Sequence, residues 1–291
     1  MAPGPAGPGA SSLEELAQFR RWSIFLPRTV SEEAERNAVY VKSRQIANPG
    51  FFDKMRERLD ALLGDCGLLQ AAGAETHSSA IVEALEAVLH GQWTAMGFLS
   101  NRQFHKALVL GELCLKLVEA LAAPQQDLLF WRVLCRANLG EIYARFKKAD
   151  EARVVLREGL ELVEDGVHPA GAAICYAHLS HVERSAYNMD EALRLADLGI
   201  EASERFIYEM QDVEEDREAK ATALATAYSV RGSCDAEQER YDHALAWFGR
   251  ALECLDKHTE ICADSQQIAA HINNEIDRMK TLQSLTKGPA V

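Results

Sequence analysis

The chain has 291 residues, of which 48% are apolar and 26% charged, a balance that predicts a folded protein with a core of ordinary size. Its 31 basic and 44 acidic residues give a formal net charge of -13, so most of its surface would repel a phosphate backbone and nucleic acid is excluded as the expected partner. No apolar run is long enough to span a bilayer, and the first residues lack the features of an export signal, so we expect no membrane partner and no secretion.

The N-terminal residues 1–12 are rich in Pro, Gly and small side chains and predict a disordered tail. Residues 13–75 predict a helical segment, in which Ser31 followed by two glutamates is the start signal of a helix that Pro49 and Gly50 end. The stretch Phe51 to Leu63 carries apolar residues at helical spacing and should stop at Gly64.

From residue 76 to residue 258 the helical pattern is almost continuous, and short breaks divide it into long helices. The breaks fall at 101–102, 123–124, 147–150, 165–169, 187–189 and 240–242. Such short connections place successive helices antiparallel, so residues 76–258 predict helical hairpins. Residues 259–285, with an isoleucine-rich stripe, predict a C-terminal capping helix, residues 31–63 could cover the other end, and residues 286–291 predict a second tail.

Pairs of small residues recur at a constant spacing of 12 along this helical region. The pairs are Ala95 with Ala107, Gly140 with Ala152, Ser180 with Ala192, and Gly232 with Ala244; a further compact residue follows each alanine by seven positions, namely Cys114, Gly159, Gly199 and Ala251. Two antiparallel helices joined by a tight turn approach most closely near that turn, where a large side chain would push the backbones apart. The spacing therefore predicts four hairpins, and we expect the later compact residue to receive the next hairpin.

These residues resemble the tetratricopeptide repeat. The best match is Leu139-Gly140-Glu141-Ile142-Tyr143 with Ala152, Leu156 and Gly159, followed by Tyr228, Gly232, Ala244, Phe248 and Ala251, and more weakly by Tyr176, Leu179, Ser180, Ala192 and Gly199 and by Ala95, Phe98, Ala107 and Cys114. The resemblance covers about residues 79–258. It implies an all-α fold, a right-handed superhelix of antiparallel helix hairpins, or α-solenoid, with capping helices at both ends.

The chain departs from that family's pattern in two ways. Its aligned alanines are 45, 40 and 52 residues apart, whereas the usual period is about 34. The proline that normally ends the second helix is replaced by an acidic residue, as at Glu119 and Glu164. Such lengthened repeats are similar to those of kinesin light chain and of cell-polarity adaptors with helical repeats.

The resemblance implies a partner-binding groove, because the first helices of successive repeats in this family line a concave surface that holds a peptide or helix. The matching positions here are Gln92, Met96, Asn138, Glu141, Arg145, His178, His181, Arg184, Ser233 and Glu237. An open alternative is that these positions form a solvated face or contact the protein's own N-terminal segment. Binding of acidic chaperone C-terminal tails is disfavoured, because of the family's clamp residues only Asn138 is present.

The sequence carries no evidence for chemistry at a site. His178 and His181 lie on neighbouring turns, but a polar groove explains them better than a metal site, and a solvated helix start explains the acidic run 212–216. No nucleotide-binding or nucleophile motif is present, so we predict no enzyme activity, no cofactor and no metal. Seven cysteines without a C-x-x-C pair predict reduced core thiols and a reducing compartment, the cytoplasm, with cilium, cytoskeleton or nucleus as alternatives.

The leading hypothesis is an adaptor or scaffold that binds a partner peptide or helix in the groove. The partner is expected to be a protein of basic or apolar character, although an acidic surface also serves solubility alone. The alternatives are a structural subunit of a larger assembly, such as an axonemal or transport complex, and a regulator gated by a peptide.

Overall fold

The computed structural model describes residues 49–286 except 70–73, 122–124, 164–167, 210–216 and 257–262. Within these residues the secondary structure consists of ten α-helices and no strand. The helices are α3 (Pro49–Leu69), α4 (Ala74–Ser100), α5 (Phe104–Ala120), α6 (Gln125–Arg145), α7 (Ala149–Glu161), α8 (Pro169–Ser185), α9 (Met189–Glu209), α10 (Arg217–Glu237), α11 (Tyr241–Asp256) and α12 (Ala263–Thr286). The predicted tail 1–12, the helices expected before residue 49, the acidic run 212–216, Cys262 and residues 287–291 lie outside the described residues.

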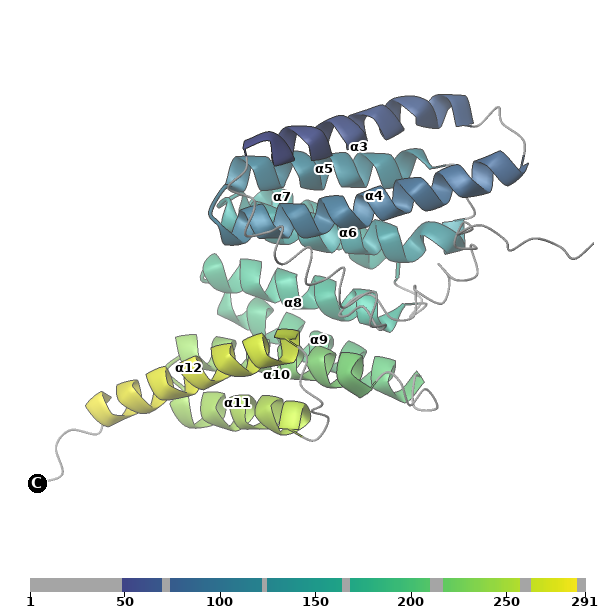
Figure 1. The fold of residues 1–291 in the computed structure, drawn as a ribbon. Helices are drawn as coiled ribbons and strands as arrows, with labels where there is room; N and C mark the ends of the chain where they lie inside the picture. Colours follow the sequence, from purple (N-terminus) through teal and green to yellow (C-terminus); the bar gives the residue numbers. More distant parts are fainter. Residues whose placement is uncertain are drawn as a thin grey trace, which may run out of the picture. The chain divides into compact units, whose positions relative to one another are not determined.

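The described helices form two compact units. The first contains α3 to α6 and ends at Phe146, and the second begins at Lys147 and contains α7 to α12. In the first unit α4 and α5 form an antiparallel hairpin, α6 packs against both, and α3 packs against α4 and α5 (Figure 1). The sequence predicted that α3 ends at Gly64, but the helix continues to Leu69. A glycine inside an exposed helix costs about 1 kcal/mol but ends the helix only where the backbone turns left-handed.

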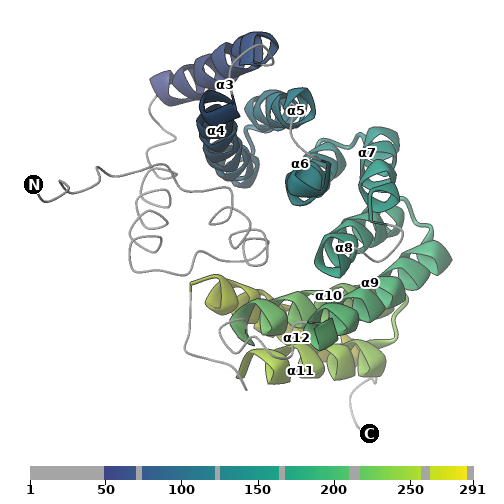
Figure 2. The ribbon, with the colours of Figure 1, turned by 90° about the vertical axis from the view of Figure 1, so that its right-hand side faces the viewer.

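The second unit is an array of hairpins in chain order. Helices α8 and α9 form one hairpin and α10 and α11 the next, while α7 packs against α8 (Figure 2). The first helices also touch one another, because α8 contacts α10 and α10 contacts α12. Contacts between successive helices and between alternate helices together give an α-solenoid arrangement.

Four inter-helix turns share one left-handed backbone position. The residues with positive φ are Arg102, Lys147, Tyr187 and Glu239, at 59° to 61°. Each lies five positions before one of the aligned alanines, so the turn keeps the register of the repeat. At Tyr187 the amide donates to the Arg184 carbonyl and the next amide donates to the Glu183 carbonyl. This double contact is the Schellman motif, which closes helices whose next residue is left-handed.

The predicted close approach near the turns is confirmed in two hairpins of the second unit. The Ser180 hydroxyl donates to the Ala192 carbonyl at 2.7 Å. A Cβ on Gly232 would lie 3.2 Å from the Ala244 carbonyl and 3.0 Å from the Phe248 ring. In the first unit Ala95 and Ala107 are both fully buried in the α4–α5 hairpin. Gly140 and Ala152 belong to different units, and their pairing stays a prediction.

The later compact residue does not act as predicted at Gly199. A Cβ there would meet Tyr176 and Ala173 of α8, which is the first helix of the same hairpin. Gly199 therefore tightens its own hairpin, because α9 remains close to α8 for two turns beyond the loop.

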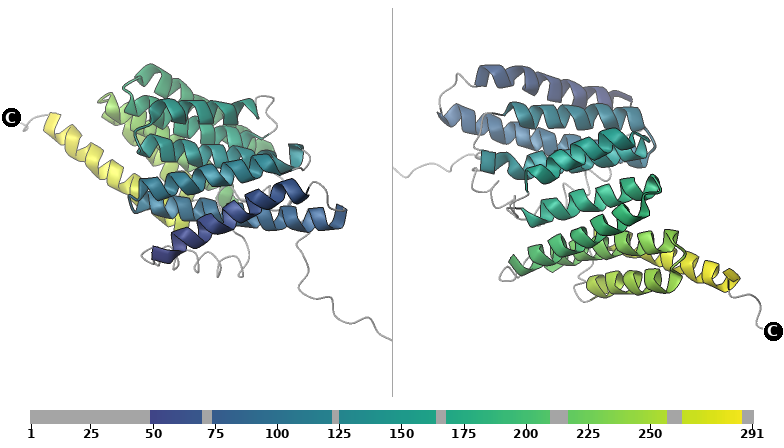
Figure 3. Two further views of the ribbon diagram at one scale, coloured as in Figure 1. Left: turned by 90° about the horizontal axis from the view of Figure 1, so that it is seen from above. Right: turned by 180° about the vertical axis from the view of Figure 1, so that it is seen from behind.

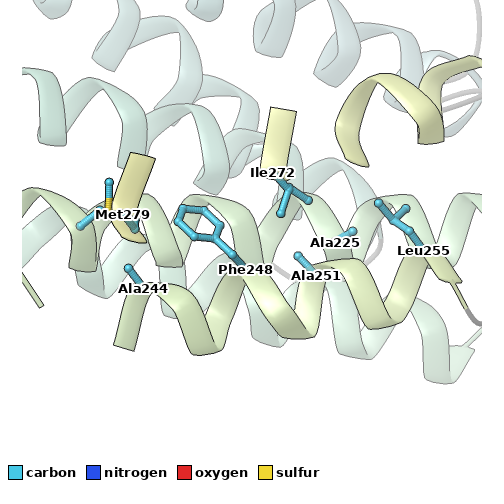
Figure 4. Close-up of a cluster of buried hydrophobic side chains, with 8 residues drawn as sticks. Ala225, Ala244, Phe248, Ala251, Leu255, Ile272 and Met279 are labelled. Atoms are coloured by element: carbon cyan, nitrogen blue, oxygen red, sulfur yellow. The ribbon is translucent and has the colours of Figure 1, made fainter. Parts of the chain in front are cut away.

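The C-terminal end of the second unit is closed by α12. Ile272 and Met279 of this helix are fully buried against Phe248, Ala251 and Leu255 of α11 (Figure 4). Other faces of α12 are exposed and polar, and its C-terminal part extends past α10 and α11 (Figure 3). A helix was predicted over residues 259–285, and its described part is 263–286; the capping role stays a prediction.

Cysteines in the described residues are free thiols, and most are buried. Burial raises the pKa of Cys135 to about 12 and that of Cys114 well above its ordinary value. The Cys114 Sγ also contacts the Val88 carbonyl at 3.6 Å. These thiols therefore behave as core side chains, as the sequence predicted.

Candidate functional site

In the first unit the predicted groove residues lie on α4 and α6, which are in contact. The Asn138 amide donates to the Gln92 Oε1 at 2.9 Å and joins these two helices. Glu141 and Arg145 form an ion pair of 3.3 Å along α6, and Met96 is half-buried on α4. The structure thus brings these five residues together on adjacent first helices.

The groove prediction required Gln92 to lie on the surface, but this residue is only 1% exposed. Its amide lowers the pKa of both Cys114 and Cys135 against the stronger effect of burial, which places it beside these two thiols. Its Nε2 has no hydrogen-bond partner among the described residues. Gln92 therefore serves packing between α4, α5 and α6, and Asn138 is held by it.

In the second unit the predicted groove residues lie on α8 and α10. Arg184 Nη1 donates to Glu237 Oε1 at 3.5 Å, and Arg184 Nη2 lies 3.0 Å from His181 Nδ1. Because a guanidinium only donates hydrogen bonds, His181 accepts through Nδ1 and carries its proton on Nε2. Ser233 donates to the Ser229 carbonyl of its own helix, and His178 is half-buried. A polar row of Arg184, His181 and Glu237 thus spans two first helices.

Polar pairs that the sequence analysis missed join each second helix to the next first helix. The pairs are Glu112 with Tyr143 at 3.0 Å, Arg153 with Glu183 at 2.7 Å, and Asp197 with Arg231 at 2.7 Å. Glu112 and Asp197 both follow their aligned alanine by five positions. Two of the three junctions therefore use the same position of the second helix, whereas Arg153 follows its aligned alanine by one position, and the chemistry of the pair changes each time.

Buried acids replace the repeat's tyrosine in the last two hairpins. Glu183 and Asp235 stand three positions after the small residue, where Tyr143 stands in an earlier hairpin. Both are almost fully buried, and each contacts the same turn position, Asn188 and Arg240 respectively. This exchange was visible in the sequence as an acid at an aromatic position.

Glu183 is ionised in this setting. Hydrogen bonds from Arg153 and then from Asn188 hold the pKa of Glu183 below its usual range, although burial acts in the opposite direction. The charge of Arg157 adds to the lowering without forming the hydrogen bond itself. The paired carboxylate thus links α7, α8 and the α8–α9 turn.

A cavity of about 560 Å³ lies between α7 and α9, with α8 between them. Its apolar lining includes Leu160 of α7, Tyr176 and Leu179 of α8, and Leu195 and Leu198 of α9. Charged residues of all three helices also line it: Arg157, Glu161, Glu183, Glu191, Arg194, Glu201 and Arg205. At 3.6 residues per turn, the cavity-lining residues of α8 lie on the side opposite His178 and His181. The predicted groove does not include this cavity.

No group of three or more His, Cys, Asp or Glu side chains in the described part of the chain is arranged to hold a metal ion. None of the described helices combines the length and hydropathy needed to cross a membrane.

Among solved structures, the chain is similar to the crystal structure of BtubC (BKLC) from P. vanneervenii, a kinesin light chain-like protein of the tetratricopeptide type. The TM-score is 0.51 at 16% sequence identity, over 83% of this chain and 94% of that one. The chain has a TPR-like helical repeat fold. No family model matches the sequence, and no curated protein matches it. At this identity the likeness supports the fold and leaves the role to the residues described above.

Proposed function

We propose that the protein is an adaptor or scaffold that binds a peptide or helix of a partner protein along its first helices. The observation that carries this proposal is the layer of first helices in each unit, α4 with α6 and α8 with α10. A helical repeat that places one helix of each hairpin side by side offers an extended surface, which such proteins use for binding.

The polar row on α8 and α10 supports a mixed, hydrogen-bonding surface. Arg184 already contacts both His181 and Glu237, so a partner meets a pre-organised polar row. In the first unit Glu141 and Arg145 offer a second charged pair, while Asn138 is engaged by Gln92. Because the Asn138 amide is already hydrogen-bonded to Gln92, this residue is less available to bind the carboxylate of a chaperone tail.

The test compares the two sides of the hairpins by photo-cross-linking in cell extract. A benzoyl-phenylalanine replaces His181 or Ser233 on first helices, and Val154 or Glu253 on second helices. We expect one dominant partner, recovered several-fold more from the first-helix positions. Equal recovery from both sets would contradict the assignment to the first helices.

A second experiment tests the charged residues with the partner so identified. The double variant Glu141→Gln and His181→Ala should weaken capture while its helicity and melting temperature stay unchanged. The exposed Glu253→Gln serves as the matched control and should capture the partner normally. Unaltered capture by the double variant would reject these residues as part of the binding surface.

A structural subunit of a larger assembly is the second candidate. It is favoured by the apolar side chains that the second helices expose, Val154 on α7 and Tyr208 on α9, at 59% and 71%. Recovery of a fixed set of subunits through the Val154 position, and not through His181, would favour this candidate over the adaptor.

A further inference from the structure

The half-buried Trp247 of α11 packs against α10. The Trp247 ring of α11 lies 5.5 Å from the Tyr228 ring of α10. Two guanidinium groups flank it, with Arg231 5.6 Å and Arg250 4.6 Å from the ring centre. Arg231 in turn is paired with Asp197 of α9. The two rings are tilted by 33°, and cation–π contacts hold this group, which is called the aromatic plug below.

The cavity between α7 and α9 occupies the corresponding place one hairpin earlier. Positions in the two hairpins can be matched by counting from their aligned small residues. On the first helices, Tyr176 and Leu179 of α8 match Tyr228 and Arg231 of α10. On the second helices, Leu195 and Leu198 of α9 match Trp247 and Arg250 of α11. The tyrosine is kept, whereas the tryptophan and both arginines are replaced by leucines. All four of the matching residues line the cavity of about 560 Å³. The cavity is therefore the space that the plug of the next hairpin fills.

The cavity has the chemistry to receive an aromatic ring. Its leucines and Tyr176 provide apolar surface, and a volume of this size lies within the usual range of ligand pockets, about 300–1,000 Å³. Arg194 is held by two hydrogen bonds of 2.7 Å to Glu191. Arg157 acts through space on the carboxylates of Glu183 and Glu191, which accept hydrogen bonds from Arg153 with Asn188 and from Arg194 respectively.

The rim also discriminates between classes of ligand by charge. Arginines and glutamates alternate on both α7 and α9, and Glu183 of α8 is already paired with Arg153 outside the lining. The rim therefore has no excess of either charge that would select a phosphate or a polycation. A polypeptide with an aromatic side chain between residues of mixed charge is complementary to an apolar floor and a mixed rim.

We propose that the cavity between α7 and α9, called the cleft from here on, binds an aromatic side chain of a partner protein. The ring takes the position that Trp247 has one hairpin later. This site lies on the opposite side of α8 from His178 and His181 and is independent of the function proposed above. Aromatic residues are the usual anchors of protein interfaces because they bury a large area at little entropic cost.

The test is methyl NMR of the full chain titrated with the peptide acetyl-Ala-Trp-Ala-amide. We expect saturable shifts of the Leu160, Leu195 and Leu198 methyl groups, with a dissociation constant of about 1 mM or tighter, a value suited to one side chain without the rest of an interface. The control peptide acetyl-Ala-Ala-Ala-amide should bind at least tenfold more weakly. Absence of a saturable shift at these methyl groups would overturn the proposal.

Variants that fill the cleft decide whether the peptide enters it. Leu195→Trp supplies the plug of the next hairpin and should reduce peptide affinity at least tenfold. Ala202→Trp, at a half-buried lining position, gives a second filled cleft if Leu195→Trp does not fold, as judged by circular dichroism. Val154→Trp adds the same side chain to α7 at a site outside the lining and should leave affinity unchanged. A folded, filled variant that binds the peptide like the parent protein would contradict the site.

Discussion

At the residue scale, four turns place non-glycine residues in the left-handed backbone conformation, which side chains with a Cβ disfavour. Arg102, Lys147, Tyr187 and Glu239 all have φ near 60°, a region in which a Cβ costs about 1–2 kcal/mol. Glycine is the usual residue at this position of the Schellman motif. The predicted breaks contain Arg102, Lys147 and Tyr187, whereas the break predicted at 240–242 begins one residue after Glu239, because α11 already starts at Tyr241. None of the four turns contains a glycine, so the sequence had no signal for the left-handed residue.

Glycine at this position should stabilise the protein. We expect Glu239→Gly to raise the free energy of unfolding by about 0.5–1 kcal/mol, because it relieves the left-handed Cβ. Urea unfolding followed by circular dichroism measures the change. Glu239→Ala, which removes the same exposed side chain but keeps the Cβ, is the matched control and should give no gain. An equal gain in both variants would assign the effect to the side chain.

The buried carboxylate of Glu183 predicts a pH-dependent contribution to stability. Its pKa is lowered in the folded protein, so the stabilisation is present above the ordinary glutamate pKa of about 4.5 and is lost as the pH falls through the folded value. Glu183→Gln should cost about 2 kcal/mol at pH 7, in the range of hydrogen bonds to charged groups. The difference from the parent protein should shrink below pH 4.5.

Thermal unfolding of both proteins between pH 3 and pH 7 measures this dependence. Glu191→Gln is the control, because Glu191 also pairs with an arginine but lies on a partly exposed helix surface. Surface pairs contribute about 0–1 kcal/mol, so this variant should differ little from the parent. A pH-independent loss in Glu183→Gln would show that packing, and not the charge, accounts for the contact.

At the element scale, glycines in similar helices have opposite roles. Gly232 of α10 faces Phe248 and the Ala244 backbone, whereas a Cβ at Gly249 of α11 would meet nothing within 4 Å. The repeat spacing distinguished Gly232 in the sequence, because it belongs to one of the aligned pairs. Gly64 belongs to no aligned pair, so the sequence offered only its low helix propensity, and the predicted helix end at this residue was wrong.

Alanine at these two glycines should change stability in opposite directions. Gly232→Ala forces α10 and α11 apart and should destabilise by about 1–3 kcal/mol. Gly249→Ala should stabilise by about 0.5–1 kcal/mol, since alanine favours the helix and has room. Chemical denaturation of the two variants side by side measures both effects. Stabilisation by Gly232→Ala would contradict the close approach of these helices.

At the scale of the whole molecule, the constant spacing of small residues predicted three hairpins that the structure contains, α4–α5, α8–α9 and α10–α11. It did not predict the division at Phe146, because the register of Gly140 and Ala152 continues across that point without a change in pattern. The cleft between α7 and α9 was also missed. Leu179, Leu195 and Leu198 line it, and the repeat pattern does not specify the residue type at these positions. The sequence signal was the replacement of larger side chains in the next hairpin by these three leucines.

The division into two units predicts that damage to one core spreads little into the other. Met279 of α12 is fully buried in the cluster with Phe248 of α11, and Met279→Ala should cost about 2–5 kcal/mol through the cavity it leaves. Hydrogen exchange with mass spectrometry should then show faster exchange in α10, α11 and α12 and little change in α3 to α6, because stability in stacked repeats is a sum of neighbouring contacts. Lys280→Ala, at the exposed neighbouring position, should leave exchange unchanged. Equal acceleration in both units after Met279→Ala would show that the two units unfold as one.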